Sequence, residues 1–415
     1  MKKGMGKRII SLGAAFCLCA GLCACSGSGA STFLLEEAES SPAPEEEGEL
    51  RYELGKIYIQ TEEILPAWLT GPTVQWTSAG DNRLVRLCYD EESNRIMVRW
   101  ENYVFGFYEV IRYQAGYLLS SSLSPGGRYW TFDRVLTDGS TNRYTASLST
   151  PNLPAPGDSL NSSADYLCAD EIVWSENGLY RARLPFETSY YKDSEVLLLT
   201  VEDMTTGKIR NVPVGLPFLG YSGGVSNDGN FCHLWAGQYD DNPSYVLISL
   251  QGGNTYTWEA PLDEPVRSAA FFTYEGAPAV LYTTDGMIGL ITGLSEGKPQ
   301  ILRLKAVTRP GNLAVTQDGS AVAYLRETGG GMADLYLCRL HNGSLTEETL
   351  LYRGIDSSAT LSFNATGRCL LLEYFTYESG YFPWSEDPPK MEEGDEKYPA
   401  LYEGRVSHSM VIELK

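Results

Sequence analysis

The sequence predicts an all-β fold made of repeated small antiparallel sheets, and two observations support this. First, a turn containing glycine or asparagine recurs before a short apolar run. It does so in YDEESNRIMVRW, LSPGGRYWTF, WSENGLYRARL, VSNDGNFCHLW, FTYEGAPAVLY, VTQDGSAVAYL and SFNATGRCLLLEY. Second, most units continue into a third strand-like run, and long amphipathic helix patterns are absent. Four strands in each repeat of about 40–50 residues are typical of a β-propeller.

The number of blades follows from the spacing of the turns. From Asn94 to Gly367, successive turn residues are 33, 51, 51, 47, 43 and 48 residues apart. Glycine and asparagine suit these turns because they accept positive φ. Seven units predict seven four-stranded blades, and the short first interval leaves six or eight open. A tandem of β-sandwiches is the alternative, but it does not readily explain the recurring order of turn and strand.

The two ends of the repeat region complement each other. The last unit ends at the C-terminus with HSMVIELK, which we interpret as its third strand. The segment GELRYELGKIYIQ, residues 48–60, is strand-like and precedes the first unit. Because closure removes exposed sheet edges, we expect residues 48–60 to complete the last blade. We therefore predict that residues 48–415 form a single propeller closed by an N-terminal strand.

The inner hairpins also resemble a known group of repeats. The segments SPGGRYWTF, SNDGNFCHLW and TQDGSAVAYL are similar to the S-x-D-G-x-x-hydrophobic hairpin of TolB-like and WD-type propellers, which include the propeller of the dipeptidyl-peptidase-IV family. The resemblance extends over residues 82–374 in repeated form. It implies a propeller that presents loops around a central opening.

The N-terminus is similar to a bacterial lipoprotein signal. MKKGMGKR is basic, IISLGAAFCLCAGLCA is apolar or small, and Leu-Cys-Ala-Cys ends at Cys25. The resemblance implies that residues 1–24 are a signal peptide and that Cys25 is acylated after cleavage. Cys23 departs from the usual pattern, in which a small residue, valine or isoleucine is more common. An ordinary secretory signal and an uncleaved anchor are the alternatives.

The segment that follows is acidic and rich in small residues. Residues 26–50 hold seven glutamates and neither lysine nor arginine, so we expect residues 25–47 to be a disordered tether. Removing the four basic residues of the signal changes the net charge from −21 to −25. This charge disfavours nucleic acid as a partner. We expect a lipid-anchored monomer at the extracytoplasmic face of the cell membrane, attached only through the anchor.

The five cysteines that follow Cys25 predict free thiols rather than a disulfide framework. Four of them lie in apolar strand-like runs, Cys168 is the exception, and no C-x-x-C motif occurs. The four are Cys88, Cys232, Cys338 and Cys369.

One short motif suggests an enzyme. GYSGG, around Ser222, fits the G-x-S-x-G elbow of α/β-hydrolases, which requires a helix directly after the serine. Here a strand, a turn and a second strand are expected instead. The chain has only three histidines as candidate bases, His233, His341 and His408. We therefore predict no catalytic residues and keep a serine hydrolase acting through Ser222 as a minor alternative.

An unusual insertion interrupts the last unit. Residues 375–405 combine aromatic and acidic side chains, which suits a protein partner, a cationic peptide or a stacked sugar. An acidic loop without a binding role is the alternative. The candidate binding residues are Tyr377, Tyr381, Phe382, Trp384, Glu386 and Asp387. The aromatic loop at residues 186–195 is a candidate for the same face.

No cofactor motif occurs, and metal ligands are weakly indicated. The groups Asp240-Asp241-Asn242 and Asp165/Asp170/Glu171 offer oxygen atoms that Ca²⁺ could use, but neither matches an EF-hand loop. We assign no metal ligands and leave calcium open.

These observations together predict a non-catalytic binding or interaction module. An envelope protein or peptide is the expected partner. Recognition of a carbohydrate or peptide ligand for uptake or sensing is the alternative.

Overall fold

The computed structural model is all-β. It describes residues 54–59, 63–65, 73–77, 82–90, 95–115, 118–135, 141–148, 171–184, 197–214, 220–236, 244–251, 256–377 and 405–415. These residues form 28 strands and one 3-10 helix, η1 (Pro125–Gly127). No helix within the described ranges is long and apolar enough to cross a membrane. The predicted fold class is confirmed.

The strands form seven antiparallel sheets, each built almost entirely from one stretch of the chain. The first sheet contains β3 (Val74–Trp76), β4 (Arg83–Asp90), β5 (Arg95–Asn102) and β6 (Phe107–Ala115). The second contains β7 (Leu118–Leu123), β8 (Tyr129–Val135) and β9 (Thr141–Ser147). The third contains β10 (Glu171–Trp174), β11 (Tyr180–Leu184), β12 (Leu197–Asp203) and β13 (Lys208–Val214).

The later sheets follow the same order along the chain. The fourth contains β14 (Gly220–Val225), β15 (Phe231–Ala236), β16 (Ser244–Ser249) and β17 (Thr257–Glu259). The fifth contains β18 (Ser268–Tyr274), β19 (Ala277–Thr283), β20 (Met287–Thr292) and β21 (Gln300–Ala306). The sixth contains β22 (Pro310–Val315), β23 (Val322–Gly329), β24 (Met332–His341) and β25 (Ser344–Asp356). The last contains β26 (Thr360–Phe363), β27 (Cys369–Tyr377) and β28 (Arg405–Leu414), joined by β1 (Leu54–Ile59) and β2 (Glu63–Leu65).

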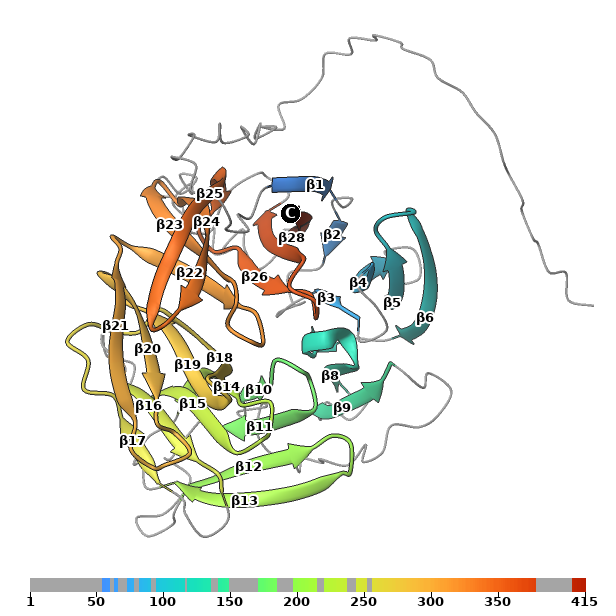
Figure 1. Ribbon diagram of the computed structural model, residues 1–415. Coiled ribbons are helices and arrows are strands. Elements are labelled where there is room, and N and C mark those ends of the chain that lie inside the picture. Colours follow the sequence, from blue (N-terminus) through green and yellow to red (C-terminus); the bar gives the residue numbers. More distant parts are fainter. Residues whose placement is uncertain are drawn as a thin grey trace, which may run out of the picture. The chain divides into compact units, whose positions relative to one another are not determined.

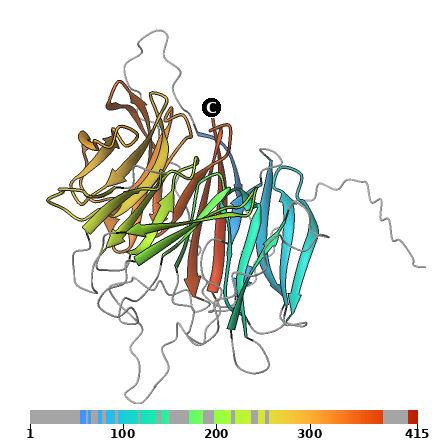
Figure 2. The same ribbon diagram turned by 90° about the horizontal axis from the view of Figure 1, so that it is seen from below.

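The sheets succeed one another around a common axis and form a β-propeller (Figure 1). Six sheets have at least four strands, and the β7–β9 sheet has three among the described residues. β3, β10, β14, β18, β22 and β26 lie nearer the axis than the other labelled strands of their sheets (Figure 1). Seen after a 90° turn, the strands of different sheets are inclined to one another, as the blue and the yellow strands show (Figure 2).

The ring is closed by the N-terminal strand, as the sequence predicted. β1 pairs antiparallel with β28, with Leu54 opposite Leu414 and Ile59 opposite Met410. β1 is therefore the outermost strand of the last sheet, and its partner is the last strand of the chain. β2 pairs with the other part of β28, which gives this sheet a fifth strand.

The predicted register of the first unit was wrong by one strand. Asn94 lies between β4 and β5, the second and third strands of the first sheet, whereas the other predicted turns join first and second strands. The run FYEVIRY is accordingly the fourth strand, β6, not the third. Glycine and asparagine are suitable both for turns between first and second strands and for turns between second and third strands. The type of turn residue therefore does not distinguish the two kinds of hairpin. This shift explains the short first interval.

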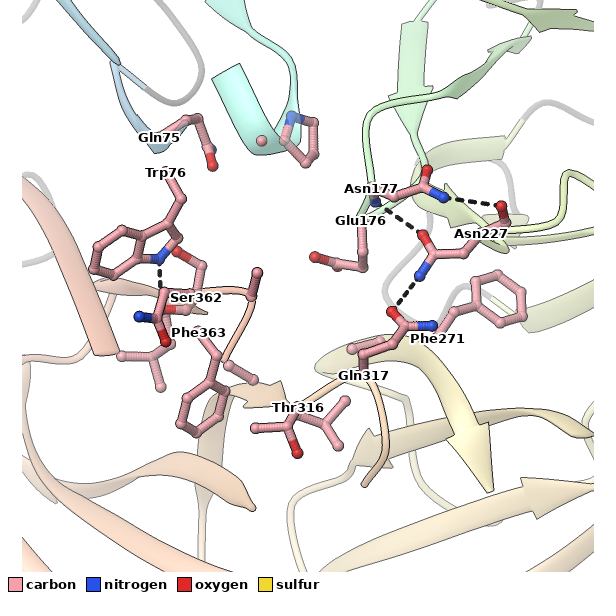
Figure 3. A pocket seen from close by; sticks show the side chains of 18 of the residues that line it. Gln75, Trp76, Glu176, Asn177, Asn227, Phe271, Thr316, Gln317, Ser362 and Phe363 are labelled. Carbon is pink, nitrogen blue, oxygen red and sulfur yellow. Dashed lines mark hydrogen bonds between the residues drawn. The ribbon is translucent and has the colours of Figure 1, made fainter. Parts of the chain in front are cut away.

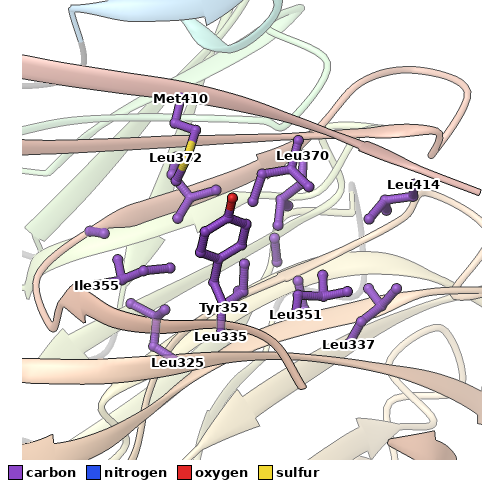
Figure 4. Close-up of a cluster of buried hydrophobic side chains, with 14 of the residues drawn as sticks. Leu325, Leu335, Leu337, Leu351, Tyr352, Ile355, Leu370, Leu372, Met410 and Leu414 are labelled. Atoms are coloured by element: carbon purple, nitrogen blue, oxygen red, sulfur yellow. The ribbon is translucent and has the colours of Figure 1, made fainter. Parts of the chain in front are cut away.

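Apolar contacts between neighbouring sheets form the core. β19 shows the principle, because Ala279 and Leu281 face the sixth sheet while Val280 and Tyr282 face the fourth. Successive side chains of a strand point to opposite faces, and both faces are buried here. Such strands therefore appear in the sequence as continuous apolar runs. Figure 4 shows the cluster between the sixth and last sheets, where Tyr352 packs among leucines and Met410.

Six interfaces between sheets contain an apolar cluster, and the one between the second and third sheets differs. Within the described part of the chain, this interface is aromatic and ionic. Tyr129 stacks on Trp174 with ring centroids 6.0 Å apart. Arg181 pairs with Glu202 at 2.6 Å and donates to Oγ1 of Thr145 at 2.5 Å, and both charged groups are buried. A buried ion pair is tolerated only with such additional hydrogen bonds.

The predicted free thiols are confirmed for Cys88, Cys232, Cys338 and Cys369, all of which are buried and unpaired with another cysteine. Burial raises the pKa of the Cys232 and Cys338 thiols to about 12, which suppresses the reactive thiolate. Cys168 lies outside the described residues.

The closure of the ring depends on a close approach at Gly55. A Cβ atom at this position would lie 2.7 Å from the main-chain oxygen of Glu413. We expect Gly55→Val to displace β1 from β28, to lower the melting temperature by several degrees and to speed proteolysis near the N-terminus. Lys56→Val is the control, because Lys56 is exposed on the same strand. Equal melting temperatures for the two variants would contradict this role of Gly55.

Candidate functional site

Five of the turns between first and second strands have the same hydrogen bonds. In the turn that starts at Ser226, the Oγ atom accepts from the N–H of Phe231 at 2.9 Å, and the N–H of Gly229 donates to the Ser226 carbonyl at 2.8 Å. Gly229 has φ of 69°, which glycine adopts without strain. Equivalent turns start at Ser124, Ser175, Thr316 and Asn364. The first and fourth residues of each turn thus maintain its shape.

The second residue of each of these turns lines a cavity of about 510 Å³ on the propeller axis. These residues are Pro125, Glu176, Asn227, Gln317 and Ala365. All seven sheets contribute to the lining, which also includes Trp76 from the first sheet and Phe271 from the fifth. We call this space the axial cavity (Figure 3).

A chain of amide hydrogen bonds fixes one side of the axial cavity (Figure 3). The main-chain N–H of Asn177 donates to Oδ1 of Asn227 at 2.8 Å, and Nδ2 of Asn177 donates to the Asn227 carbonyl at 3.0 Å. Nδ2 of Asn227 then donates to Oε1 of Gln317. The chain connects the third, fourth and sixth sheets, so it holds the turns in one arrangement.

Glu176 places a carboxylate in this amide surrounding. Its side chain is exposed and points into the axial cavity (Figure 3). The protein atoms around the cavity disfavour the charged form by desolvation and raise the pKa of the Glu176 carboxyl. No ion pair to Glu176 occurs among the described residues. Among the described residues, the carboxylate in the cavity therefore has no cationic partner.

Asn364 adds an unused hydrogen-bond donor. Its side chain is only 5% exposed and lines the axial cavity. The main-chain N–H of Cys369 donates to Oδ1 of Asn364 at 3.0 Å, which determines the orientation of the amide group. The Nδ2 atom has no hydrogen-bond partner. Buried polar groups of this kind are uncommon and call for a partner.

Aromatic and apolar side chains contribute other parts of the wall. Trp76 is buried and donates from Nε1 to the Ser362 carbonyl at 3.3 Å. Phe271 and Phe363 line other parts of the cavity. Apolar walls with a few polar groups are typical of ligand sites, which commonly measure about 300–1,000 Å³.

The candidate residues of the insertion fall outside the described part of the chain, except for Tyr377 at the end of β27. Tyr377 pairs with Arg405, so the insertion leaves and rejoins the sheet at one point. β27 begins at Cys369, beside the turn at the axial cavity, and its nine residues extend about 26 Å from it. The insertion is therefore attached at the opposite end of the propeller from the axial cavity.

The loop at residues 186–195 also lies outside the described residues, but its attachment can be placed. It connects β11 and β12, the second and third strands of their sheet, just as the insertion connects β27 and β28. Both loops are therefore attached at the same end of the ring. Cys25, the predicted lipidation site, likewise lies outside the described residues.

Ser222 lies within β14 and is followed by a turn and β15 rather than by a helix. The backbone is irregular there, with a register shift between Tyr221 and Gly223. A Cβ atom at Gly223 would lie 2.2 Å from the main-chain oxygen of His233, so glycine is needed for this close approach. Burial lowers the pKa of His233 to about 3, which makes it a poor base at neutral pH. GYSGG is thus explained by strand geometry.

No group of three or more His, Cys, Asp or Glu side chains in the described ranges is placed to hold a metal ion. The residues Asp165, Asp170, Asp240, Asp241 and Asn242 lie outside those ranges. Calcium binding there stays a prediction.

The residues of the axial cavity were not identified from the sequence. The recurring turns were interpreted only as hairpins of the repeat, and their second residues were not considered as site residues. A usable signal was present, because Glu176, Asn227 and Gln317 occupy the same position in three repeats. That position directly follows the first residue of the turn, whose side chain accepts the main-chain hydrogen bond. It has no role in the turn hydrogen bonds described above.

Comparisons with known proteins do not assign the chain to a family. No protein-family model matches it, and no curated protein matches it. A chain of the mitotic checkpoint complex is similar over 82% of this chain and 95% of its own, with 12% identity and a TM-score of 0.48. TolB from Acinetobacter baumannii shows 11% identity over 66% of each chain, with a TM-score of 0.37. The dihydro-heme d1 dehydrogenase NirN shows 14% identity over 73% of this chain and 61% of its own, with a TM-score of 0.43. These low values support no functional argument.

The raised pKa of Glu176 predicts a pH-dependent effect of its removal. The folded state binds the proton more tightly than the unfolded state, so this group costs stability as pH rises above the unfolded pKa. We expect Glu176→Gln to have a higher melting temperature than the wild type at pH 7 and an equal one near pH 4. Glu296→Gln, at an exposed turn, controls for net charge. A lower melting temperature for Glu176→Gln at pH 7 would show that the carboxylate has a stabilising partner.

Proposed function

We propose that the protein is a non-catalytic binding module, held at the extracytoplasmic face of the membrane, with the axial cavity as its ligand site. The supporting observation is the construction of the cavity. All seven sheets contribute residues, an amide chain holds the turns, and the second residue of each of the five turns lines the cavity. A rigid scaffold that positions loop residues in this way is common among binding sites.

The proposal of a non-catalytic role is supported by the positions of Ser222 and of the three histidines. Ser222 lies in a strand, and His233 is buried and neutral. His341 lies at an exposed hairpin, and His408 stacks on Tyr374 at 4.7 Å. None of these arrangements resembles a nucleophile beside an oriented base.

The membrane location rests on the N-terminal sequence. The signal-like residues 1–24, the acylation site at Cys25 and the acidic tether at 25–47 together suit a lipid-anchored domain. The chain then enters β1, the outermost strand of the last sheet. The tether would thus connect to the strand that closes the ring.

An envelope protein or a peptide is the partner that we favour. A flexible segment can enter a cavity of about 510 Å³ that a folded domain cannot enter. A carbohydrate is the second candidate, since Trp76 and the surrounding amides resemble groups that bind sugars. The insertion at 375–405 offers a separate surface for a larger partner.

Lipid anchoring can be tested by Cys25→Ser. We expect the wild type in the membrane fraction and the variant unprocessed or released from it, because acylation needs the thiol. Metabolic labelling with an alkyne-bearing palmitate should mark only the wild type. Labelling of both proteins would contradict acylation at Cys25.

Partner binding can be tested by cross-linking in cells and affinity capture, read by mass spectrometry. We expect one abundant envelope partner for the wild type and its loss for the double variant Asn227→Ala/Gln317→Ala, which breaks the amide chain. Deletion of residues 380–397 serves as the comparison, because the insertion is attached at the other end of the propeller. A partner lost only in the deletion would move the site to the insertion. If a well-folded wild type captures no partner, the proposal of a protein-binding module fails.

A further inference from the structure

Two polar groups of the axial cavity lack partners and together indicate a type of ligand. Within the part of the chain that the structure describes, the carboxylate of Glu176 is exposed in the cavity without an ion pair, and Nδ2 of Asn364 is buried without an acceptor. One group calls for a cation and the other for a hydrogen-bond acceptor. They belong to turns of the third and last sheets, so a ligand that satisfies both must enter the space between the turns.

The surroundings of Glu176 favour a cation over a neutral group. The neighbouring polar side chains of the wall are neutral amides, Gln75, Asn177, Asn227 and Gln317 (Figure 3). Arg128 also lines the cavity, but it forms no ion pair with Glu176, and desolvation alone accounts for the raised pKa. A cation that entered would remove the electrostatic cost of this carboxylate.

The donor of Asn364 favours a ligand with a carbonyl group. Oδ1 accepts from the main-chain N–H of Cys369, whereas Nδ2 has no acceptor among the described residues, so the NH₂ group is the unsatisfied part of this side chain. A main-chain carbonyl oxygen is a suitable acceptor, and pairing would remove the penalty of a buried unsatisfied donor. A simple amine or a metal cation offers no such acceptor.

We propose that the axial cavity binds a peptide segment with a lysine or arginine side chain. The cationic group contacts the carboxylate of Glu176, and a main-chain carbonyl accepts from Nδ2 of Asn364. This inference rests on the proposed binding function and specifies its ligand. The net charge of −21 attracts cationic segments to the protein, and Glu176 then gives one of them a defined place.

The test uses pools of acetylated, amidated pentapeptides that share a fixed central residue and vary elsewhere. Central lysine, arginine, norleucine, glutamine and glutamate are compared on immobilised wild-type protein at 150 mM salt. We expect at least about tenfold greater retention of the lysine and arginine pools than of the norleucine pool. Glu176→Gln should abolish this preference, because it removes the charge and keeps the shape.

Two controls separate the site from general attraction to an acidic protein. Glu296→Gln removes the same charge at an exposed turn and should retain the full preference. Free n-butylamine, used as a competitor, should bind at least about tenfold more weakly than the lysine pool, because it has no carbonyl for Asn364. Melting temperatures verify that each variant is folded.

Four results would overturn the inference, and the last of them would leave the proposed binding function intact. The first is retention of neutral or acidic pools over cationic ones. The second is a lysine preference that Glu176→Gln and Glu296→Gln reduce equally. The third is competition by n-butylamine as strong as that by the lysine pool, which would indicate a site for simple amines. If all pools are retained equally while the cellular partner still depends on Asn227 and Gln317, the binding function stands and the peptide assignment fails.

Discussion

The pairing of β1 with β28 is the constraint on which the rest of the structure depends. It joins the beginning of the domain to its last strand and leaves the last sheet with β1 as its outermost strand. A buried polar network supports the same region. The carboxylate of Glu373 accepts from the main-chain N–H of Thr73 at 3.0 Å, and Arg86 donates to Oγ of Ser409 at 2.7 Å. The first and last sheets meet in the same region through an apolar cluster that includes Trp76 and Leu371, so closure of the last sheet and contact between these sheets occur together.

Burial of charged groups where the first and last sheets meet has an energetic cost, and hydrogen bonds to these groups offset it. Glu373 is almost fully buried, and desolvation raises the pKa of its carboxyl although Thr73 and Val74 donate to it. Buried charged groups also occur between the second and third sheets, where Arg181 and Glu202 form an ion pair in place of an apolar cluster. Buried polar groups require particular partners, so they specify which sheets come together. The apolar interfaces contribute most of the burial but discriminate less between neighbours.

The inner turns serve the fold and the site with different residues. Serine, threonine or asparagine at the first position accepts a main-chain hydrogen bond, and glycine at the fourth adopts positive φ. The second residue takes part in neither and lines the axial cavity. Proline, glutamate, asparagine, glutamine and alanine all occur there. The lining can therefore change while the turn keeps its shape, which is how one scaffold can offer many binding sites.

The sequence by itself determined the fold class, the repeated unit and the strand that closes the ring. These depend on short-range patterns such as Ser-Asn-Asp-Gly followed by an apolar strand, and on the missing fourth strand of the last unit. The sequence did not distinguish the hairpin at Asn94 from the inner hairpins, because both have the same local chemistry. Only the tertiary structure decided that Glu176, Asn227, Gln317 and Asn364 share one cavity. These residues are far apart in the chain, and only the closed ring brings their turns to a common axis.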